Sequence, residues 1–324
     1  MSALAPALLA AACSGDCPDG AEAAGAGRCL RWTPTARLPE RAGPETFRAL
    51  PDGRALALAG GTPYVLDPTA ATWTTGPDAP FAPVDAAVLA DGRVVAVGVV
   101  GQAAGYAEWW PGAKSWSAVH ELPTYFARVV ALPTEGALFL GADRDTSAPR
   151  AWRSDRNSAM TPTAAPAATW GALVPLADGS ILKLSSAPER FDPASGTWTG
   201  GAPQPGGRGV TEALPLASGD VLVIDAPAPS ASLTAEIYAP DDDAWRPAAS
   251  PARGGDLAEL PDGAVLATSG NSGALLHVYD PARDEWTITA APFDGRTDRR
   301  ILRLADGRVL EVHGRLAFLL DLVD

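Results

Sequence analysis

The chain has 324 residues, 47% of them hydrophobic, and a formal net charge of −13 at pH 7. This length allows two ordinary domains or one large domain, and the apolar content excludes global disorder. The acidic balance argues against binding to nucleic acid and against electrostatic docking to anionic lipid head groups.

The first residues form a short apolar segment that leads to a cysteine. Residues 1–12 are rich in Ala and Leu, are too short to cross a bilayer as a helix, and precede Cys13. The segment resembles the signal peptide of bacterial lipoproteins, in which that cysteine is lipidated after cleavage. We therefore expect export to the bacterial cell envelope or beyond it, with a lipid on Cys13 as the one membrane attachment. An Ala-rich N-terminus without a signal is the alternative.

The three cysteines all lie within the first 29 residues. If Cys13 carries a lipid, Cys17 and Cys29 remain as an even pair, which predicts a disulfide in an oxidising compartment. A zinc site is the rival use, but three cysteines without a nearby histidine make a poor tetrahedral ligand set. Residues 13–28 are expected to form a flexible linker.

A turn motif recurs through the rest of the chain: a glycine, usually after Asp, between two short apolar runs. Asp91-Gly92, for example, lies between "AAVLA" and "RVVAVG". Asp-Gly between apolar runs predicts a β-hairpin, because both residues tolerate the positive φ of a tight turn. Successive turn glycines are 39, 44, 43, 40, 44 and 44 residues apart, as differences of their positions. They are Gly53, Gly92, Gly136, Gly179, Gly219, Gly263 and Gly307.

A third strand follows each hairpin, and in most units it ends in an aromatic-Asp-Pro group or a variant of it, such as Tyr279-Asp280-Pro281. Proline ends the strand, and a Trp five residues later marks a fourth. The third unit departs from this pattern, with Met160 near the Trp position. The tryptophans in step are Trp73, Trp116, Trp198, Trp245 and Trp286.

Four antiparallel strands every forty-odd residues is the period of a β-propeller blade. Only two strands follow the last turn, whereas residues 29–39 contain Trp32, 41 residues before Trp73, without a unit of their own. We therefore predict an all-β fold over residues 29–324. It is a seven-bladed propeller with four antiparallel strands per blade, and the N-terminal strand closes the last blade.

The repeat "LPDGRALALAGG" with "LDPTAATW" resembles the bacterial Kelch repeat, which also occurs in galactose-oxidase-like propellers. The copper chemistry of such oxidases needs imidazole and phenolate ligands and a cysteine crosslinked to a tyrosine. This chain has only His120, His277 and His313, and every cysteine precedes the ring. We expect no copper site, no other metal and no cofactor.

No catalytic set is present in the sequence. There is no Gly-x-Ser-x-Gly, His-x-x-x-His or phosphate-loop motif, and turn chemistry explains the many Asp residues. No catalytic residue is assigned.

The face opposite the Asp-Gly turns carries the less usual residues. Arginines there lie just before or within the start of innermost strands, where they are expected to crown the central channel with aromatic residues beside them. Such a cluster would bind a carboxylate or a sulfated sugar through bidentate hydrogen bonds. The alternative is that these arginines pair with acids of adjacent blades or are simply solvated. The candidate ligand-binding residues are Arg128, Tyr125, Trp170, Arg208, Arg253, Arg299, Arg300 and His120.

These features predict an exported, non-enzymatic and monomeric propeller that binds a partner protein or a glycan. One alternative is a carbohydrate-active enzyme, an epimerase or lyase, with its site at the channel mouth. A second alternative is an intracellular scaffold, which would keep its cysteines reduced.

Overall fold

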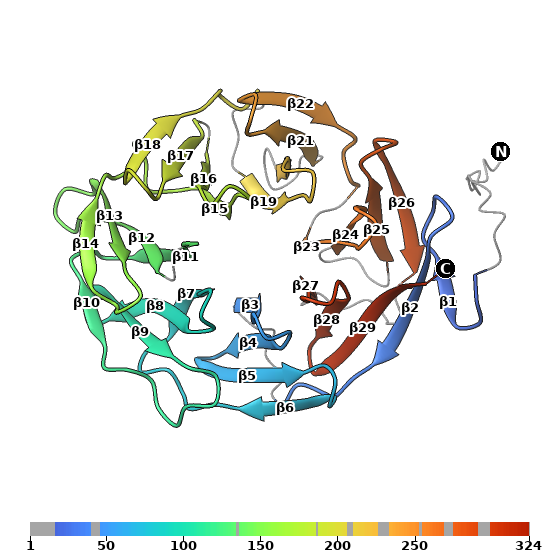
Figure 1. The fold of residues 1–324 in the computed structure, drawn as a ribbon, viewed down its shortest axis with the longest axis horizontal. Coiled ribbons are helices and arrows are strands. Elements are labelled where there is room, and N and C mark those ends of the chain that lie inside the picture. Colours follow the sequence, from blue (N-terminus) through green and yellow to red (C-terminus); the bar gives the residue numbers. More distant parts are fainter. Residues whose placement is uncertain are drawn as a thin grey trace, which may run out of the picture.

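The computed structural model is a ring of seven β-sheets around a central axis (Figure 1). Six sheets have four strands, the seventh has five, and the strands pair in antiparallel fashion. The predicted all-β, seven-bladed propeller is confirmed. The structure describes residues 17–39, 46–133, 136–185, 187–205, 210–225, 233–252, 255–268, 275–290 and 299–323.

The strands of each blade run outward from the axis in chain order. Blade 1 contains β3 (Thr46–Ala49), β4 (Ala55–Ala59), β5 (Thr62–Asp67) and β6 (Thr72–Thr75). Blade 2 contains β7 (Pro83–Val88), β8 (Val94–Val100), β9 (Ala103–Trp109) and β10 (His120–Leu122). Blade 3 contains β11 (Ala127–Ala131), β12 (Ala137–Ala142), β13 (Pro149–Ser154) and β14 (Met160–Thr163). Blade 4 contains β15 (Ala172–Pro175), β16 (Ile181–Leu184), β17 (Glu189–Asp192) and β18 (Thr197–Gly200).

The remaining three blades follow the same order, with one addition. Blade 5 contains β19 (Val210–Pro215), β20 (Val221–Asp225), β21 (Thr234–Ala239) and β22 (Ala244–Ala248). Blade 6 contains β23 (Leu257–Glu259), β24 (Val265–Thr268), β25 (Leu275–Asp280) and β26 (Glu285–Ala290). Blade 7 contains β27 (Arg299–Arg303), β28 (Val309–His313), β29 (Leu316–Val323) and the N-terminal strands β2 (Cys29–Pro34) and β1 (Ala21–Ala23).

The ring is closed by β2, as predicted. This strand pairs with β29 in a register that runs from Cys29 opposite Val323 to Pro34 opposite Phe318. The predicted disulfide between Cys17 and Cys29 is also present, and β1 pairs with the other edge of β2. Within the segment expected to be a linker, β1 and the turn after it reach blade 6, where the hydroxyl of Thr287 donates to the carbonyl of Ala24 at 3.0 Å.

The hairpin between the first and second strands of a blade has a repeated geometry. In blade 1, the N–H of Leu50 donates to the carbonyl of Arg54 at 2.8 Å. Gly53 has φ +87°, and the carboxylate of Asp52 accepts the N–H of Arg54 at 3.1 Å. The turn itself therefore uses the Asp, as its chemistry predicts.

Blade 3 departs from this geometry. The N–H of Leu132 donates to the carbonyl of Gly136 at 2.8 Å, so Gly136 takes the place of Arg54 and not that of the turn glycine. The expected turn centre at Gly136 is one residue out of register. Glycine is required there for another reason, because a Cβ would lie 2.0 Å from the carbonyl oxygen of Ser154.

The core is divided into seven apolar clusters, each between two neighbouring blades. The cluster between blades 6 and 7, for example, joins Leu266 and Val278 to Val309 and to Leu30 of the closing strand. All four side chains are at most 1% exposed. Full burial of one such side chain contributes about 2 kcal/mol. Each blade thus buries its apolar side chains by packing against its neighbours, as is typical of stacked repeats.

The recurring tryptophan fills the space between blades and also forms a hydrogen bond. The indole N–H of Trp245 donates to the carbonyl of Ala202, which follows the outermost strand of the preceding blade, at 2.9 Å. Equivalent bonds are formed by Trp73, Trp116, Trp198 and Trp286. The aromatic residue before Asp-Pro lies beside the Trp, as in the pair Tyr279 and Trp286, with ring centroids 5.0 Å apart.

Blade 2 keeps this bond although its outermost strand is displaced along the chain. The expected fourth strand at Trp116 is wrong, because Trp116 lies in the connection between β9 and β10, and β10 begins at His120. The indole of Trp116 still donates to Pro77 at 2.8 Å. The recurrence of the Trp in blade 2 is therefore explained by its contact with the preceding blade and not by a position in a strand.

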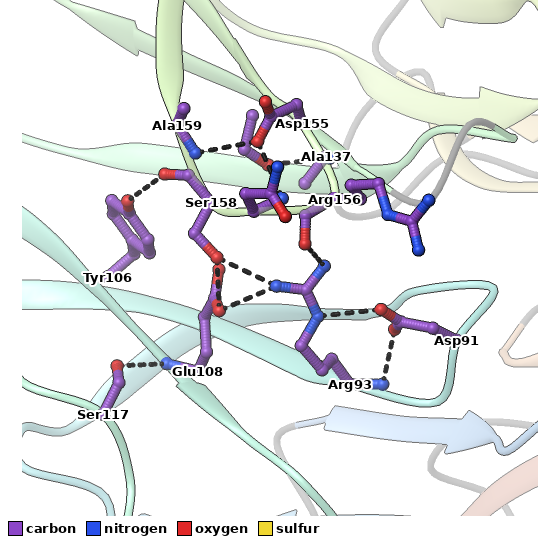
Figure 2. Close-up of polar contacts among 12 residues, drawn as sticks. Asp91, Arg93, Tyr106, Glu108, Ser117, Ala137, Asp155, Arg156, Ser158 and Ala159 are labelled. Atoms are coloured by element: carbon purple, nitrogen blue, oxygen red, sulfur yellow. Dashed lines mark hydrogen bonds and ion pairs between the residues drawn. The ribbon is translucent and has the colours of Figure 1, made fainter.

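A buried polar cluster joins blades 2 and 3, where Met160 replaces the tryptophan (Figure 2). The guanidinium of Arg93 is 5% exposed and bonds to the carboxylates of Asp91 and Glu108, at 2.9 and 3.0 Å. It also donates to the hydroxyl of Ser158 and to the carbonyl of Arg156, both at 2.9 Å. The bond to Asp91 thus fixes the turn, and those to Ser158 and Arg156 cross the junction between the blades.

Candidate functional site at the loop-side rim

The seven innermost strands share a position that lies four residues before the hairpin leucine. We call it the ring position. Because each hairpin leucine forms the same bond to the residue after the turn, these seven residues are structurally equivalent around the axis. The ring position lies at the end of the innermost strands opposite the Asp-Gly turns, which we call the loop-side rim. Its occupants are Thr46, Asp85, Arg128, Ala172, Glu212, Asp256 and Arg300.

Two acid–arginine pairs of the same construction lie in this ring. The carboxylate of Asp85 in blade 2 accepts the Nε–H of Arg128 in blade 3 at 2.9 Å and the N–H of Val129 at 3.2 Å. The carboxylate of Asp256 in blade 6 accepts the Nε–H of Arg300 in blade 7 at 2.5 Å and the N–H of Ile301 at 3.2 Å. In both pairs an acid of one blade orients the arginine of the next.

Arg48 lies two residues beyond the ring position of blade 1. Its guanidinium is 3.7 Å from the carboxylate of Asp85, and its side chain is 44% exposed. Desolvation lowers the pKa of Arg48, the charges of Arg300 and Arg128 lower it further, and those of Asp85 and Asp256 oppose the shift. These couplings place the guanidinium of Arg48 within electrostatic reach of both acid–arginine pairs.

Glu212 of blade 5 differs from the other two acids of the ring. No residue in the described part of the chain donates a hydrogen bond to its carboxyl group or forms an ion pair with it. The pKa of Glu212 is raised to about 7, mainly by desolvation and also by the charge of Asp256, while the charge of Arg300 opposes the shift. A carboxyl group with a pKa near neutrality can both accept and donate a proton at physiological pH.

Three aromatic side chains lie next to Arg128 on the same rim. Phe126 stacks on Trp170 with ring centroids 4.6 Å apart and an interplanar angle of 12°, and Tyr125 meets Phe126 edge to face at 4.7 Å. Trp170 is 65% exposed and Tyr125 is 39% exposed. We call Tyr125, Phe126 and Trp170 the aromatic platform.

Two glycines position the aromatic platform. A Cβ on Gly141, at the end of β12, would lie 2.5 Å from the carbonyl oxygen of Phe126, so the backbone before β11 packs directly on that strand. Gly171 has φ +144°, and a Cβ there would lie 2.3 Å from the carbonyl oxygen of Leu184. This backbone conformation favours glycine and directs the chain so that Trp170 is exposed.

The structure places four of the residues that the sequence nominated as ligand-binding on the loop-side rim, three of them on one sector. Arg128, Tyr125 and Trp170 lie on one sector of the rim, and Arg300 lies on another part of the same ring. Arg299 is 6% exposed, with its guanidinium bonded to Glu311 and to the carbonyl of Leu275.

One nominated residue lies away from the ring, and others lie outside the described residues. His120 lies on β10, the outermost strand of blade 2, and stacks on Tyr106 with ring centroids 4.9 Å apart, so it does not join the ring. His313 lies at the end of β28, opposite Arg299, and is 4% exposed. Arg208, Arg253 and the lipidation candidate Cys13 lie outside the described residues.

Sequence reasoning missed four charged residues of the rim: Arg48, Asp85, Glu212 and Asp256. Three lie in short strands, Asp256 lies directly before β23, and none belongs to a chemical motif. Alignment of the units on the hairpin leucine, rather than on the turn glycine, would have brought the last three to one position.

The described part of the chain holds no group of three or more His, Cys, Asp or Glu side chains placed to bind a metal ion. It also lacks any helix that could span a membrane.

Comparisons with known proteins place the fold but not a family. No protein-family model and no curated protein matches the chain. Among solved structures, a streptogramin B lyase is similar with a TM-score of 0.67 and 11% identity, over 91% of this chain and 98% of the lyase. Virginiamycin B lyase from Staphylococcus aureus gives a TM-score of 0.67 and 10% identity, over 91% and 100% of the two chains. A fungal alcohol oxidase of the AA5 family in complex with copper gives 0.62 and 14%, over 94% and 74%. At these identities the likeness shows the propeller fold alone, so the chain has neighbours among both lyases and oxidases.

Proposed function

We propose that this chain is an exported Kelch-repeat propeller, attached to the membrane by a lipid on Cys13, that binds a glycan at its loop-side rim. The observation that carries the proposal is the stack of Phe126 on the 65% exposed Trp170 beside the half-exposed guanidinium of Arg128. The apolar C–H face of a sugar ring packs on a flat indole, and arginine recognises carboxylate or sulfate groups.

The charges of the rim favour binding over catalysis. Asp85 and Asp256 are already engaged by arginines of the next blade and by backbone N–H groups, so they serve to orient Arg128 and Arg300. Oriented arginines that stay accessible suit the recognition of an anionic group. An aromatic platform of three side chains suits a sugar better than a protein surface, because stable protein interfaces need about 800 Å² from each partner.

The disulfide supports export. A bond between Cys17 and Cys29 belongs to an oxidising compartment, which a signal peptide over residues 1–12 would give access to. Mass spectrometry of the mature N-terminus tests the anchor. A diacylated or triacylated Cys13 is expected, whereas an intact Met1 would contradict both export and lipidation.

Binding to a glycan array tests the function with the full chain purified from membranes. Trp170→Ala is expected to weaken binding about tenfold or more, because the exposed indole is the largest contact surface on the rim. Trp110→Ala is the matched control, since Trp110 is 50% exposed but follows β9, away from the innermost strands. Equal loss with both variants, or no glycan bound by the unaltered protein, would contradict the proposal.

A second candidate function is a carbohydrate-active enzyme with Glu212 as its acid–base group. The observation in its favour is the pKa of about 7 of a carboxyl group on the rim. Incubation of the array ligand with the protein distinguishes the two functions. An enzyme gives a product of new mass or new configuration, and the rate of its formation falls at least a hundredfold in Glu212→Gln.

A further inference from the structure

Blade 1 carries a charged side chain at a place where the other blades carry apolar ones. Arg48 lies on β3, two residues before the hairpin leucine Leu50. The structurally equivalent residues of the other six blades pack in or against the apolar clusters between blades. Arginine at a core position lowers stability, and such departures from a repeated pattern are expected at functional sites. The six equivalent residues are Ala87, Val130, Val174, Leu214, Ala258 and Leu302.

The guanidinium of Arg48 lies in a recess and keeps a donor for a ligand. Nη1 donates to the carbonyl of Phe47 at 3.0 Å, whereas Nη2 is 3.7 Å from the carboxylate of Asp85, which is too far for a hydrogen bond. The side chain is 44% exposed, yet desolvation is the first cause that lowers the pKa of Arg48, and repulsion by Arg128 and Arg300 adds to it. A group that is both accessible and desolvated lies in a concave part of the surface. Because β3 is an innermost strand, this concavity faces the axis of the ring (Figure 1).

Arg128 reaches the same carboxylate from blade 3. Its Nε–H donates to the second oxygen of Asp85 at 2.9 Å, and its side chain is 46% exposed. Neither Nη atom of Arg128 donates a hydrogen bond to a residue in the described part of the chain. The two guanidiniums contact the two oxygens of one carboxylate, so the contacting nitrogens are at most about 9 Å apart. We call Arg48, Asp85 and Arg128 the two-arginine site.

We infer that the two-arginine site binds the sulfate ester of a sulfated sugar, with Arg48 and Arg128 donating to different oxygens of one sulfate group. The inference rests on the proposed function, because it names the class of glycan that the rim recognises. Trp170 lies directly before β15, Arg128 lies on β11 and Arg48 on β3, and these strands follow in this order around the ring (Figure 1). A sugar on the aromatic platform therefore extends its sulfate group past Arg128 toward Arg48.

The charge of the two-arginine site favours a sulfate ester over a phosphate ester. Two arginines against Asp85 leave a charge of +1 (two minus one), which the single negative charge of a sulfate ester neutralises. A phosphate monoester carries about −1.5 to −2 at pH 7 and would leave negative charge beside Asp85.

The arrangement of the two guanidiniums favours a sulfate ester over a carboxylate. A carboxylate has two oxygens in one plane and pairs best with a single guanidinium in bidentate fashion. The three terminal oxygens of a sulfate ester point in three directions, so they can accept from guanidiniums that approach from different blades. Hydrogen bonds of about 2.9 Å on either side allow one sulfate group to bridge donors at this separation.

Titration calorimetry of the full chain at pH 7 tests the inference with D-glucose 6-sulfate, D-glucose 6-phosphate, sodium D-glucuronate and methyl glucoside. The sulfate ester is expected to bind at least tenfold more tightly than methyl glucoside, since hydrogen bonds to charged groups are the strong ones. It is also expected to bind more tightly than the phosphate ester and glucuronate. Its affinity should fall as NaCl rises from about 0.01 to about 1 M, while that of methyl glucoside should not change. These measurements on the unaltered protein do not depend on the folding of a variant.

The variant Arg48→Leu places at this position the kind of side chain that the other six blades have. We expect it to bind D-glucose 6-sulfate about 10- to 100-fold more weakly and to keep or raise the temperature of thermal unfolding. Arg246→Leu is the matched control, because Arg246 is 51% exposed, pairs with Asp220 and lies on β22, the outermost strand of blade 5. This control removes the same charge and should keep the affinity of the unaltered protein.

Three results would overturn the inference. One is an unchanged affinity for the sulfate ester in Arg48→Leu, or an equal loss in Arg246→Leu. The second is tighter binding of the phosphate ester or of glucuronate than of the sulfate ester. The third is a lowered unfolding temperature in Arg48→Leu, which would assign Arg48 to the junction between blades 1 and 2.

Methyl glucoside separates this inference from the proposed function. Trp170-dependent binding of methyl glucoside without a gain for the sulfate ester would refute the two-arginine site and leave the proposed glycan-binding function standing. If none of the four sugars binds, both fail together.

Discussion

Glu212 lowers the stability of the folded chain at alkaline pH, because its carboxyl group must ionise without a partner. Its pKa rises from 4.5 in the unfolded chain to about 7 in the folded one. The folded state therefore binds the proton more tightly, and the contribution to stability is full below pH 4.5 and is lost as the pH rises through 7.

Replacement of Glu212 by Gln is expected to remove this dependence. Each pKa unit corresponds to about 1.4 kcal/mol, and partial exposure to solvent reduces the total, so we expect a gain on the order of 2 kcal/mol at pH 8.5. At pH 4 the variant and the unaltered protein should have equal free energies of unfolding. Urea denaturation at both pH values measures the difference. An equal gain at pH 4 and pH 8.5 would show that the carboxyl group does not titrate as stated.

At the scale of residues, the sequence predicts the cations and aromatic groups of the rim better than its acids. Arg128, Tyr125 and Trp170 stand out because they interrupt apolar or Pro-rich stretches just before innermost strands. Asp85 and Glu212 do not, because an acid in a short strand is not distinguishable from a solvated one until the blades are superposed. His120 was expected on the loop-side rim, but β10 is set back along the chain, and this cannot be read from the spacing of Trp116.

At the scale of elements, the junction between blades 2 and 3 shows how one contact replaces another. Where the other described junctions of blades 1 to 6 use an indole N–H, this one uses the guanidinium of Arg93, which reaches across to Arg156 and Ser158 (Figure 2). Ser158 has φ +63°, a conformation that is unfavourable for a residue with a side chain, and its hydroxyl donates to Glu108 at 2.7 Å. The two bonds of this hydroxyl compensate for the unfavourable backbone conformation.

Arg93→Ala is expected to destabilise the protein by about 3–4 kcal/mol, because it removes the positive charge that neutralises the buried carboxylate of Glu108. The matched control is Arg54→Ala. Arg54 occupies the equivalent place after the turn of blade 1 and pairs with Asp52, but its side chain is 35% exposed, so a loss below about 1 kcal/mol is expected. Thermal unfolding followed by circular dichroism compares the two. Equal losses of stability in the two variants would mean that the bonds of Arg93 across the junction contribute nothing beyond its bond within the turn.

The number of blades and the closing strand could be predicted because every blade needs the same turn and the same contact with its neighbour. The Asp-Gly turn and the interblade Trp must recur wherever a hairpin meets a neighbour, so their spacing counts the blades. Exact strand positions could not be predicted where a blade makes the same contact from a different part of its chain, or uses a motif residue for a different purpose. Trp116 donates to Pro77 from a connection, and Gly136 avoids Ser154 instead of forming a turn.

At the scale of the whole molecule, the N-terminal segment joins blades 6 and 7 in two ways. β2 completes blade 7, while Arg28 forms ion pairs with Asp262 and Asp280 of blade 6, and the disulfide ties Cys17 to the start of β2. Closure of the ring thus depends on a segment that no single blade contains.

Removal of the disulfide in Cys17→Ser/Cys29→Ser is expected to lower the free energy of unfolding by about 3 kcal/mol, the loop-closure value for a bridge of this span. Reduction of the unaltered protein should give the same loss. Urea denaturation with and without a phosphine reductant measures it. If the unaltered protein loses stability with the reductant and the double variant does not, the effect belongs to this bond. No change in either would mean that β1 and Arg28 fix the segment without it.

The pairing of β2 with β29 also determines when the ring can form. Leu30 and Leu322 face each other across the seam, yet 292 residues separate them (322 minus 30). A ribosome that adds 5–20 residues per second delivers these partners roughly 15–60 s apart. During that interval β1 can cover one edge of β2, but the edge that faces β29 has no partner, so we expect the ring to close only after the last blade has been synthesised.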